Sequence, residues 1–298
     1  MDNKKTENLL DFIGYHEKWH GQVQTHRKKY QYNQNDFLIE EIFKRMEITN
    51  GFFVEFGAWD GIFGSNTRKL FESGWNSGIL IEPAKDRFLD LQKNYLDYPN
   101  IHTVNSFVEL EGNNTFDSIA DNYVSDKIDF CSIDIDGLDL DIFETIEKYL
   151  PSVICIEGGQ MLSPVNNTRL PREISKHNIQ QGIYTMNQSF EEKGYKLLCT
   201  FQDSFFIKKE YYHLFNVEDD LFNLYLDGIV AYPRIPWIIS TLNSVGLEND
   251  ILNYIVKDIP LPISTSKEEK IEWINKNYVS ICKAIEELRI SYHKENSL

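Results

Sequence analysis

The sequence predicts an α/β fold with a mostly parallel, doubly wound sheet, because two apolar segments bracket a helical one early in the chain. Residues 52–56 are apolar apart from Glu55, which is typical of a strand buried on both faces. Gly57 allows a tight turn directly after this strand. Residues 65–73 have the pattern of a helix, and residues 78–82 are predicted to form a second strand. This order is that of a βαβ unit, whose two strands are parallel.

The remaining segments continue the alternation of helices and strands. In the first helix Ser65 is the expected N-cap, and Gly74 lies just beyond the helix end. Further helices are expected over 36–46, 84–95, 140–150 and about 180–193. Further strands are expected over 101–104, 128–133 and 153–156, followed by a closing antiparallel hairpin of 195–200 and 205–208. Right-handed connections would place the loops that follow the strands at one edge of the sheet, which is the expected site.

Length and composition divide the chain into three parts. With 298 residues and 42% hydrophobic content, the chain can bury one large core. We expect a helical cap segment over 1–35, a central α/β domain over 36–215 and a helical extension over 216–298. Apolar residues of the extension recur at a 3-4-3-4-3 spacing: Ile271, Ile274, Tyr278, Ile281, Ile285 and Leu288. This seam packs either within the monomer or against a second copy, as a homodimer through the C-terminal helix.

The charge balance restricts the partners. The chain has 46 acidic and 30 basic residues, which gives a net charge of −16. Nucleic acid is therefore not an expected partner, because polyanion binding depends on Lys and Arg that neutralise phosphates. The sequence has no long apolar run, and its first residues lack the apolar stretch of a signal peptide. We therefore expect no membrane span and a cytoplasmic location.

The acids around the first turn indicate which nucleotide could bind. Glu82 closes the second strand at the spacing where nucleotide-binding βαβ units carry a carboxylate for a ribose. Glu55 and Asp60 flank the turn, where they would repel the pyrophosphate of a dinucleotide. They suit a cation instead, and S-adenosylmethionine (SAM) carries a sulfonium and an ammonium group. Gly57 would let the backbone approach the methionine end of SAM closely.

Several ordered motifs support this interpretation through a family resemblance. They are Glu55-Phe56-Gly57-Ala58-Trp59-Asp60-Gly61, Ser65-Asn66-Thr67, Gly74-Trp75, Ile81-Glu82-Pro83 and Ser132-Ile133-Asp134-Ile135-Asp136-Gly137. With them the chain resembles the FkbM-like branch of class I SAM-dependent methyltransferases over roughly residues 30–215. Residues 32–36 resemble that group's upstream Tyr-Ser-Gln-x-Gly-Glu-Asp element without its Gly-Glu. The resemblance and the strand-end positions imply a Rossmann-like fold and these cofactor-binding residues: Gln34, Glu55, Gly57, Ala58, Asp60, Asn66, Glu82, Pro83, Asn105, Ser106 and Asp134.

Acidic residues at the ends of the fourth and fifth strands are the candidates for catalysis. Methyl transfer from a sulfonium is an in-line displacement, and a hydroxyl acceptor must also lose a proton. Asp134 and Asp136 follow the fourth strand and Glu157 follows the fifth, so the three carboxylates are expected at one edge. They could hold Mg²⁺ or Mn²⁺, which prefer oxygen ligands, or one of them could act as the general base without a metal. His177, in the long segment 158–180 that is a candidate substrate lid, is a further candidate base.

The predicted function is therefore that of a SAM-dependent methyltransferase with a small-molecule or glycan acceptor. Members of the resembled family often methylate sugar hydroxyls, so the resemblance implies a sugar hydroxyl or amine in glycan or polysaccharide biosynthesis. Two alternatives remain open. One is a methyltransferase of a small secondary metabolite or peptide, and the other is a catalytically silent SAM-binding partner protein.

Overall fold

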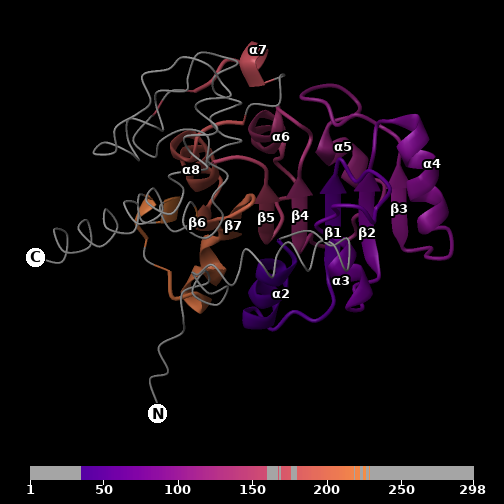
Figure 1. Ribbon diagram of the computed structural model, residues 1–298, viewed down its shortest axis with the longest axis horizontal. Coiled ribbons are helices and arrows are strands. Elements are labelled where there is room, and N and C mark those ends of the chain that lie inside the picture. The colour runs from indigo at the N-terminus through magenta and orange to yellow at the C-terminus, as the bar shows by residue number, and fades with distance from the viewer. Residues whose placement is uncertain are drawn as a thin grey trace, which may run out of the picture.

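One sheet organises the part of the chain that the structure describes. The computed structural model describes residues 35–159, 167, 169–175, 180–217, 219–221, 224, 225 and 228. The seven strands have the order β3-β2-β1-β4-β5-β7-β6 (Figure 1). They span Phe52–Phe56 (β1), Ser77–Ile81 (β2), Ile101–Val104 (β3), Phe130–Ile133 (β4), Val153–Ile156 (β5), Tyr195–Thr200 (β6) and Ser204–Lys208 (β7). Strands β1 to β5 are parallel, and β7 runs antiparallel to both of its neighbours.

Helices cover both faces of the sheet. One apolar cluster joins the sheet to α2 (Asp36–Arg45), α3 (Arg68–Glu72) and α4 (Lys85–Asn94). A second joins the opposite face to α5 (Phe116–Ala120), α6 (Asp139–Thr145) and α8 (Ile183–Glu192). The short helix α7 (Arg172–Ser175) precedes α8, and a 3₁₀ helix, η2 (Lys209–Leu214), follows β7. The predicted fold class is confirmed: a Rossmann-like, mostly parallel, doubly wound sheet with a closing antiparallel hairpin.

Strand β1 lies at the centre of this arrangement. Its side chains alternate between the two clusters, since Phe53 packs on the side of α2 and α3 whereas Val54 and Phe56 pack on the other side. The chain extends from β1 to β3 in one direction and then returns to place β4 on the other side of β1. Ligands of open α/β sheets bind at the carboxyl ends of the strands where the strand order reverses in this way. Here that position lies between the ends of β1 and β4, at the upper edge of the sheet in Figure 1.

Helix α6 is shorter than the predicted helix over 140–150. It ends at Thr145 because the following backbone N–H groups bond elsewhere. The amides of Glu147, Lys148 and Tyr149 all donate to the carboxylate of Asp117 in the first turn of α5. A side chain distant in sequence therefore sets this helix end, and residue pattern alone could not reveal it.

Helix α3 begins later than predicted. It starts at Arg68 with Thr67 in the N-cap position, not at Ser65. The hydroxyl of Ser65 nevertheless accepts hydrogen bonds from the backbone N–H groups of Thr67 (3.2 Å) and Arg68 (3.0 Å). Ser65 thus satisfies the first amides of the helix from a turn that precedes it.

Most of the predicted terminal segments lie outside the described residues. This applies to the cap segment 1–35 except for its last residue, to nearly all of the extension 216–298 and to the apolar seam from Ile271 to Leu288. Within the described part, no helix is long and apolar enough to cross a membrane.

Candidate active site

A cavity of about 580 Å³ opens at the reversal point of the sheet. Loops after four strands line it: Gly57 follows β1, Glu82 follows β2, Ser106 follows β3, and Asp134 with Asp136 follows β4. These residues come from separate parts of the sequence and meet because parallel strands end at the same edge. Glu82, Asp134 and Asp136 give the wall three acids, and no Lys or Arg is among the described lining residues.

Gly57 brings the β1 loop against the β4 loop. Its φ is +70°, which is unfavourable for a residue with a side chain. A Cβ atom at this position would lie 2.0 Å from the backbone oxygen of Asp134. Both observations require glycine here, so the closeness of the two loops depends on this residue.

Two residues with side chains also have left-handed backbone conformations at the cavity. Trp59 has a φ of 52° and Asp136 a φ of 59°, and both line the cavity. Such conformations cost on the order of 1–3 kcal/mol each and often occur at functional sites. Trp59 lies in the same loop as Gly57, and Asp136 lies in the same loop as Asp134. Unfavourable backbone conformations in both loops are consistent with a binding site.

Glu82 is fixed at the end of β2 by backbone amides. One carboxylate oxygen accepts from the N–H of Trp59 (2.8 Å), and the other accepts from the N–H of Ala84 (2.7 Å). The side chain therefore joins the loop after β2 to the loop after β1. A carboxylate offers about four acceptor positions, so hydroxyl groups of a ligand can still bind to it.

The other predicted residues near β2 and β3 divide into lining and supporting ones. Pro83 and Ser106 line the cavity. Asn105 instead donates to the backbone oxygens of Glu82 (2.8 Å) and Pro83 (3.1 Å). Asn105 thus fixes the backbone that carries Glu82, and it is not among the described lining residues.

Glu55 points into the protein interior and is not one of the described residues that line the cavity. Its carboxylate accepts from the hydroxyls of Ser65 and Thr67, both at 2.7 Å, and from the backbone N–H of Asn66 at 2.6 Å. Burial raises the pKa of Glu55 to about 7, although these hydrogen bonds oppose the shift. In the described structure Glu55 therefore holds the β1–α3 loop together.

Ala58, Asp60 and Asn66 likewise support the loop after β1. Ala58 is buried. Asp60 accepts from the backbone N–H groups of Ile62 and Phe63, which closes a turn. Asn66 is buried and donates to the hydroxyl of Ser132 (2.9 Å) on β4. None of these three is a lining residue of the described cavity.

Asp134, Asp136 and Glu157 form the acidic cluster. Each offers a carboxylate oxygen, and these oxygens all lie within 4.8 Å of one another. Burial, followed by the negative charge of Glu157 and other nearby acids, raises the pKa of Asp134 well above its usual range. A divalent cation would relieve this repulsion, and oxygen ligands at such spacing fit a hard cation. The three residues that the sequence placed at one edge thus meet in space.

Two further side chains, Asp139 and Gln180, position this cluster. Asp139 is fully buried and accepts from the backbone N–H groups of Ile135 and Gly137, both at 2.9 Å. It therefore shapes the loop that carries Asp134 and Asp136. Burial raises the pKa of Asp139 to about 6 against these hydrogen bonds. Gln180, which precedes α8, donates from Nε2 to Glu157 at 2.6 Å.

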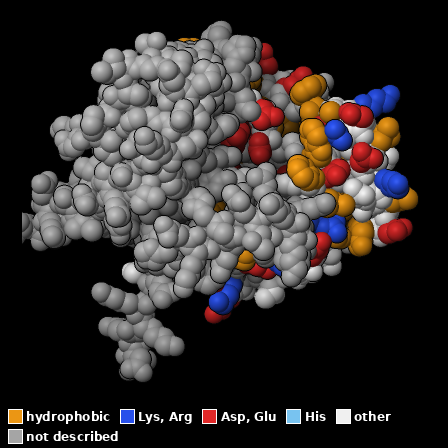
Figure 2. Space-filling view, viewed as in Figure 1, with side chains coloured by type: hydrophobic (Ala, Val, Ile, Leu, Met, Phe, Trp, Pro, Cys, Tyr) orange, Lys and Arg blue, Asp and Glu red, His pale blue; other side chains and the backbone are white. Residues whose placement is uncertain are grey.

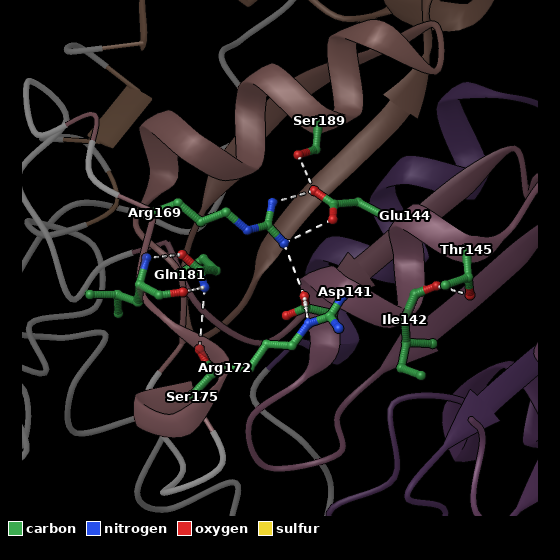
Figure 3. Close-up of polar contacts among 10 residues, drawn as sticks. Asp141, Ile142, Glu144, Thr145, Arg169, Arg172, Ser175, Gln181 and Ser189 are labelled. Carbon is green, nitrogen blue, oxygen red and sulfur yellow. Dashed lines mark hydrogen bonds and ion pairs between the residues drawn. The ribbon is translucent and has the colours of Figure 1, made fainter. Parts of the chain in front are cut away.

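A polar network attaches the segment 169–175 to α6 (Figure 3). Arg169 makes a bidentate pair with Glu144 (2.6 and 2.8 Å) and also contacts Asp141 at 3.1 Å. Arg172 donates to the same Asp141 oxygen at 2.8 Å. The Asp141 side chain is only 2% exposed, so the two arginines neutralise a buried charge.

Aromatic side chains surround the cavity mouth. Trp59, Phe63 and Phe107 line the cavity and remain 43%, 59% and 71% exposed. Figure 2 shows hydrophobic side chains gathered on the described part of the face in view. The guanidinium of Arg87 lies over the Trp59 ring, 4.1 Å from its centre. Phe63 and Phe107 were not predicted as site residues, since isolated aromatics in loops carry no motif.

Gln34, expected to contact the cofactor, and His177, expected as a base, lie outside the described residues. Most of the predicted lid over 158–180 does so as well.

Comparison with known proteins finds matches among solved structures only. No protein-family model matches the chain, and no curated protein matches it. A SAM-dependent methyltransferase from Aquifex aeolicus has 9% identity and a TM-score of 0.37, over 63% of this chain and 95% of that one. A proposed SAM-dependent methyltransferase from Methanococcus maripaludis has 17% identity and a TM-score of 0.37, over 70% and 97% of the two chains. A proposed caffeoyl-CoA O-methyltransferase from Staphylococcus aureus has 15% identity and a TM-score of 0.42, over 67% and 99%.

Proposed function

We propose that the chain is a SAM-dependent methyltransferase. The observation that carries this proposal is the charge of the cavity: three acids and no described Lys or Arg line a nucleotide-sized space at the reversal point of the sheet. A pyrophosphate would meet repulsion there, whereas the sulfonium and ammonium groups of SAM would meet opposite charge. The cavity thus fits a cationic adenosine derivative better than a dinucleotide.

The lining residues suggest how SAM would be held. Glu82 would accept hydrogen bonds from the ribose hydroxyls, as a carboxylate after the second strand does in related nucleotide sites. The exposed rings of Trp59, Phe63 and Phe107 offer apolar surface for the adenine. Asp134, beside Gly57, would face the charged methionine end.

The acidic cluster would serve the acceptor. SAM supplies the electrophilic methyl group, and the protein must align the acceptor with it and remove a proton. Asp134, Asp136 and Glu157 would do so by holding Mg²⁺ or Mn²⁺, which lowers the pKa of a bound hydroxyl. Their oxygens lie close enough to share one ion, which supports this assignment.

The acceptor class rests on the resemblance to the FkbM-like branch. From it we propose a sugar hydroxyl or amine in glycan or polysaccharide biosynthesis as the methylated group. The cavity is open to solvent at its aromatic rim, so a bulky acceptor could approach it.

Methyl transfer can be tested with SAM labelled in the methyl group. Purified protein is incubated with panels of nucleotide sugars and amino sugars, phenolic metabolites and short peptides, and products are read by mass spectrometry. We expect label in a sugar, lost in EDTA and restored by Mg²⁺ or Mn²⁺. Label in a phenol or peptide would contradict the sugar assignment, and unchanged transfer in EDTA would contradict the metal. SAM binding without transfer to any acceptor would favour a silent partner protein.

A further inference from the structure

Gln180 lies where the connection between β5 and α8 meets the acidic cluster. The residue is 1% exposed. Its amide nitrogen donates to Glu157 at 2.6 Å. A neutral amide therefore contacts the acid that follows β5.

This contact reaches the cluster from the side of β5. Glu157 is itself one of the clustered acids. On the side of β4, Asp139 holds the backbone of Ile135 and Gly137, on either side of Asp136. Gln180 thus holds the acid that follows β5, and Asp139 shapes the loop that carries the two acids after β4.

The backbone of Gly158 packs closely against Gln180. Gly158 has a φ of +119°, and a Cβ atom there would lie 2.6 Å from the Cβ of Gln180. The neighbouring Gln181 is bonded in both directions to the backbone of Leu170, each at 2.9 Å, and also donates to Ser175 (Figure 3). Gln180 therefore projects from a well-anchored piece of chain.

We propose that Gln180 is the positioning residue for Glu157, which it orients toward Asp134 and Asp136 for binding of a divalent cation. The inference rests on the metal-dependent part of the proposed function. Acids at this spacing repel one another, and the hydrogen bond from Gln180 holds Glu157 against this repulsion. An amide donor fixes the carboxylate without adding a charge that would compete with the cation. Loss of such a supporting hydrogen bond typically lowers metal affinity about 10–100-fold.

Titration with MnCl₂, followed by the electron paramagnetic resonance signal of free Mn²⁺, tests the proposal without a methyl acceptor. Gln180→Met keeps the approximate volume and removes the donor. Gln181→Met is the matched control, because this adjacent residue is 2% exposed and its side chain bonds to Leu170 and Ser175 of the 169–175 segment. We expect Gln180→Met to weaken Mn²⁺ binding about tenfold or more and Gln181→Met to change it less than twofold.

A milder variant covers the case in which Gln180→Met does not fold. Gln180→Asn retains a buried amide but is one methylene shorter and would not reach Glu157 at hydrogen-bond distance, so we expect it to weaken Mn²⁺ binding as well. Wild-type affinity in a folded Gln180 variant, or equal losses in the Gln180 and Gln181 variants, would overturn the proposal. Absence of Mn²⁺ binding to the wild-type protein would also overturn it. SAM binding by that same sample would show that the cofactor assignment still stands.

Discussion

Gly57 is the residue at which the backbone of the site has the least freedom. It is one of several glycines with positive φ, but its missing Cβ is also what allows the contact with the backbone of Asp134. Gly64 has the same φ of +70°, and no atom lies within 4 Å of the place where its Cβ would be. A comparison of substitutions at the two positions therefore separates the cost of the left-handed backbone from the cost of a steric clash.

We expect Gly57→Ala to destabilise the protein far more than Gly64→Ala. The left-handed conformation alone should cost Gly64→Ala roughly 1–2 kcal/mol. Gly57→Ala carries the same strain and a clash with the Asp134 carbonyl, so its unfolding free energy should fall by several kcal/mol. Urea denaturation of both variants measures the difference, and equal losses would show that the loops are not packed as described.

Glu55 has a different setting from the one that the sequence suggests. The sequence places an acid beside the glycine turn, which suggests a cofactor contact. The alternation of β1 instead directs Glu55 to the face of Phe53, where Ser65, Asn66 and Thr67 enclose it. The hydroxyl and amide partners lie ten or more residues from Glu55 in the sequence, so no local sequence pattern indicates them.

Glu55→Gln should remove a pH dependence of stability. The pKa of Glu55 is raised from 4.5 to about 7 in the folded protein. Between these values the folded protein keeps a proton that the unfolded chain has released, so stability falls as pH rises. The stability of wild type relative to Glu55→Gln should drop by on the order of 3 kcal/mol from pH 4.5 to 7. Urea melts across this range measure the difference, and parallel pH profiles would contradict the assigned shift.

Among the elements, strands were predicted more accurately than helix ends. The bounds 52–56, 101–104 and 153–156 agree with β1, β3 and β5, because continuous apolar runs bounded by turns define buried strands. The ends of α3 and α6 differ, since side chains from other elements bind the amides that a longer helix would use. The same distinction applies to the candidate site: the strand-end acids were predictable, whereas the positions of Gln180, Phe63 and Phe107 depend on tertiary packing.

Helix α6 depends on anchors at both ends because seven residues form a marginal helix alone. Asp139 holds the loop before it and Asp117 holds the chain after it. Asp117→Ala would leave the amides of residues 147–149 without this acceptor, and we expect a loss of roughly 2–3 kcal/mol. Asp121→Ala, which removes an exposed pair with Lys148, should have little effect. Thermal unfolding distinguishes them, and similar stability of the two variants would refute the anchor.

For the whole molecule, the strand order determines which residues lie together at the cavity. Residues after β1, β2, β3 and β4 share one cavity, although Gly57 and Asp134 are far apart in the sequence. The acidic excess of the chain is repeated on the cavity wall, where Glu82, Asp134 and Asp136 lie without a described basic residue among the lining. The order of elements in the sequence could predict that these residues lie at one edge, because parallel strands with right-handed crossovers bring their carboxyl ends together. It could not predict the shape of the cavity or its aromatic rim.

Calorimetric titration with S-adenosylhomocysteine, SAM and NAD tests the central claim most directly. Wild-type protein should bind both adenosyl compounds at one site and NAD far more weakly, because the acidic wall repels a pyrophosphate. Glu82→Gln keeps an acceptor for a backbone amide but loses the charge, and it should weaken both adenosyl compounds by roughly 1–3 kcal/mol. Preference for NAD, or no binding of either adenosyl compound by folded protein, would contradict the account.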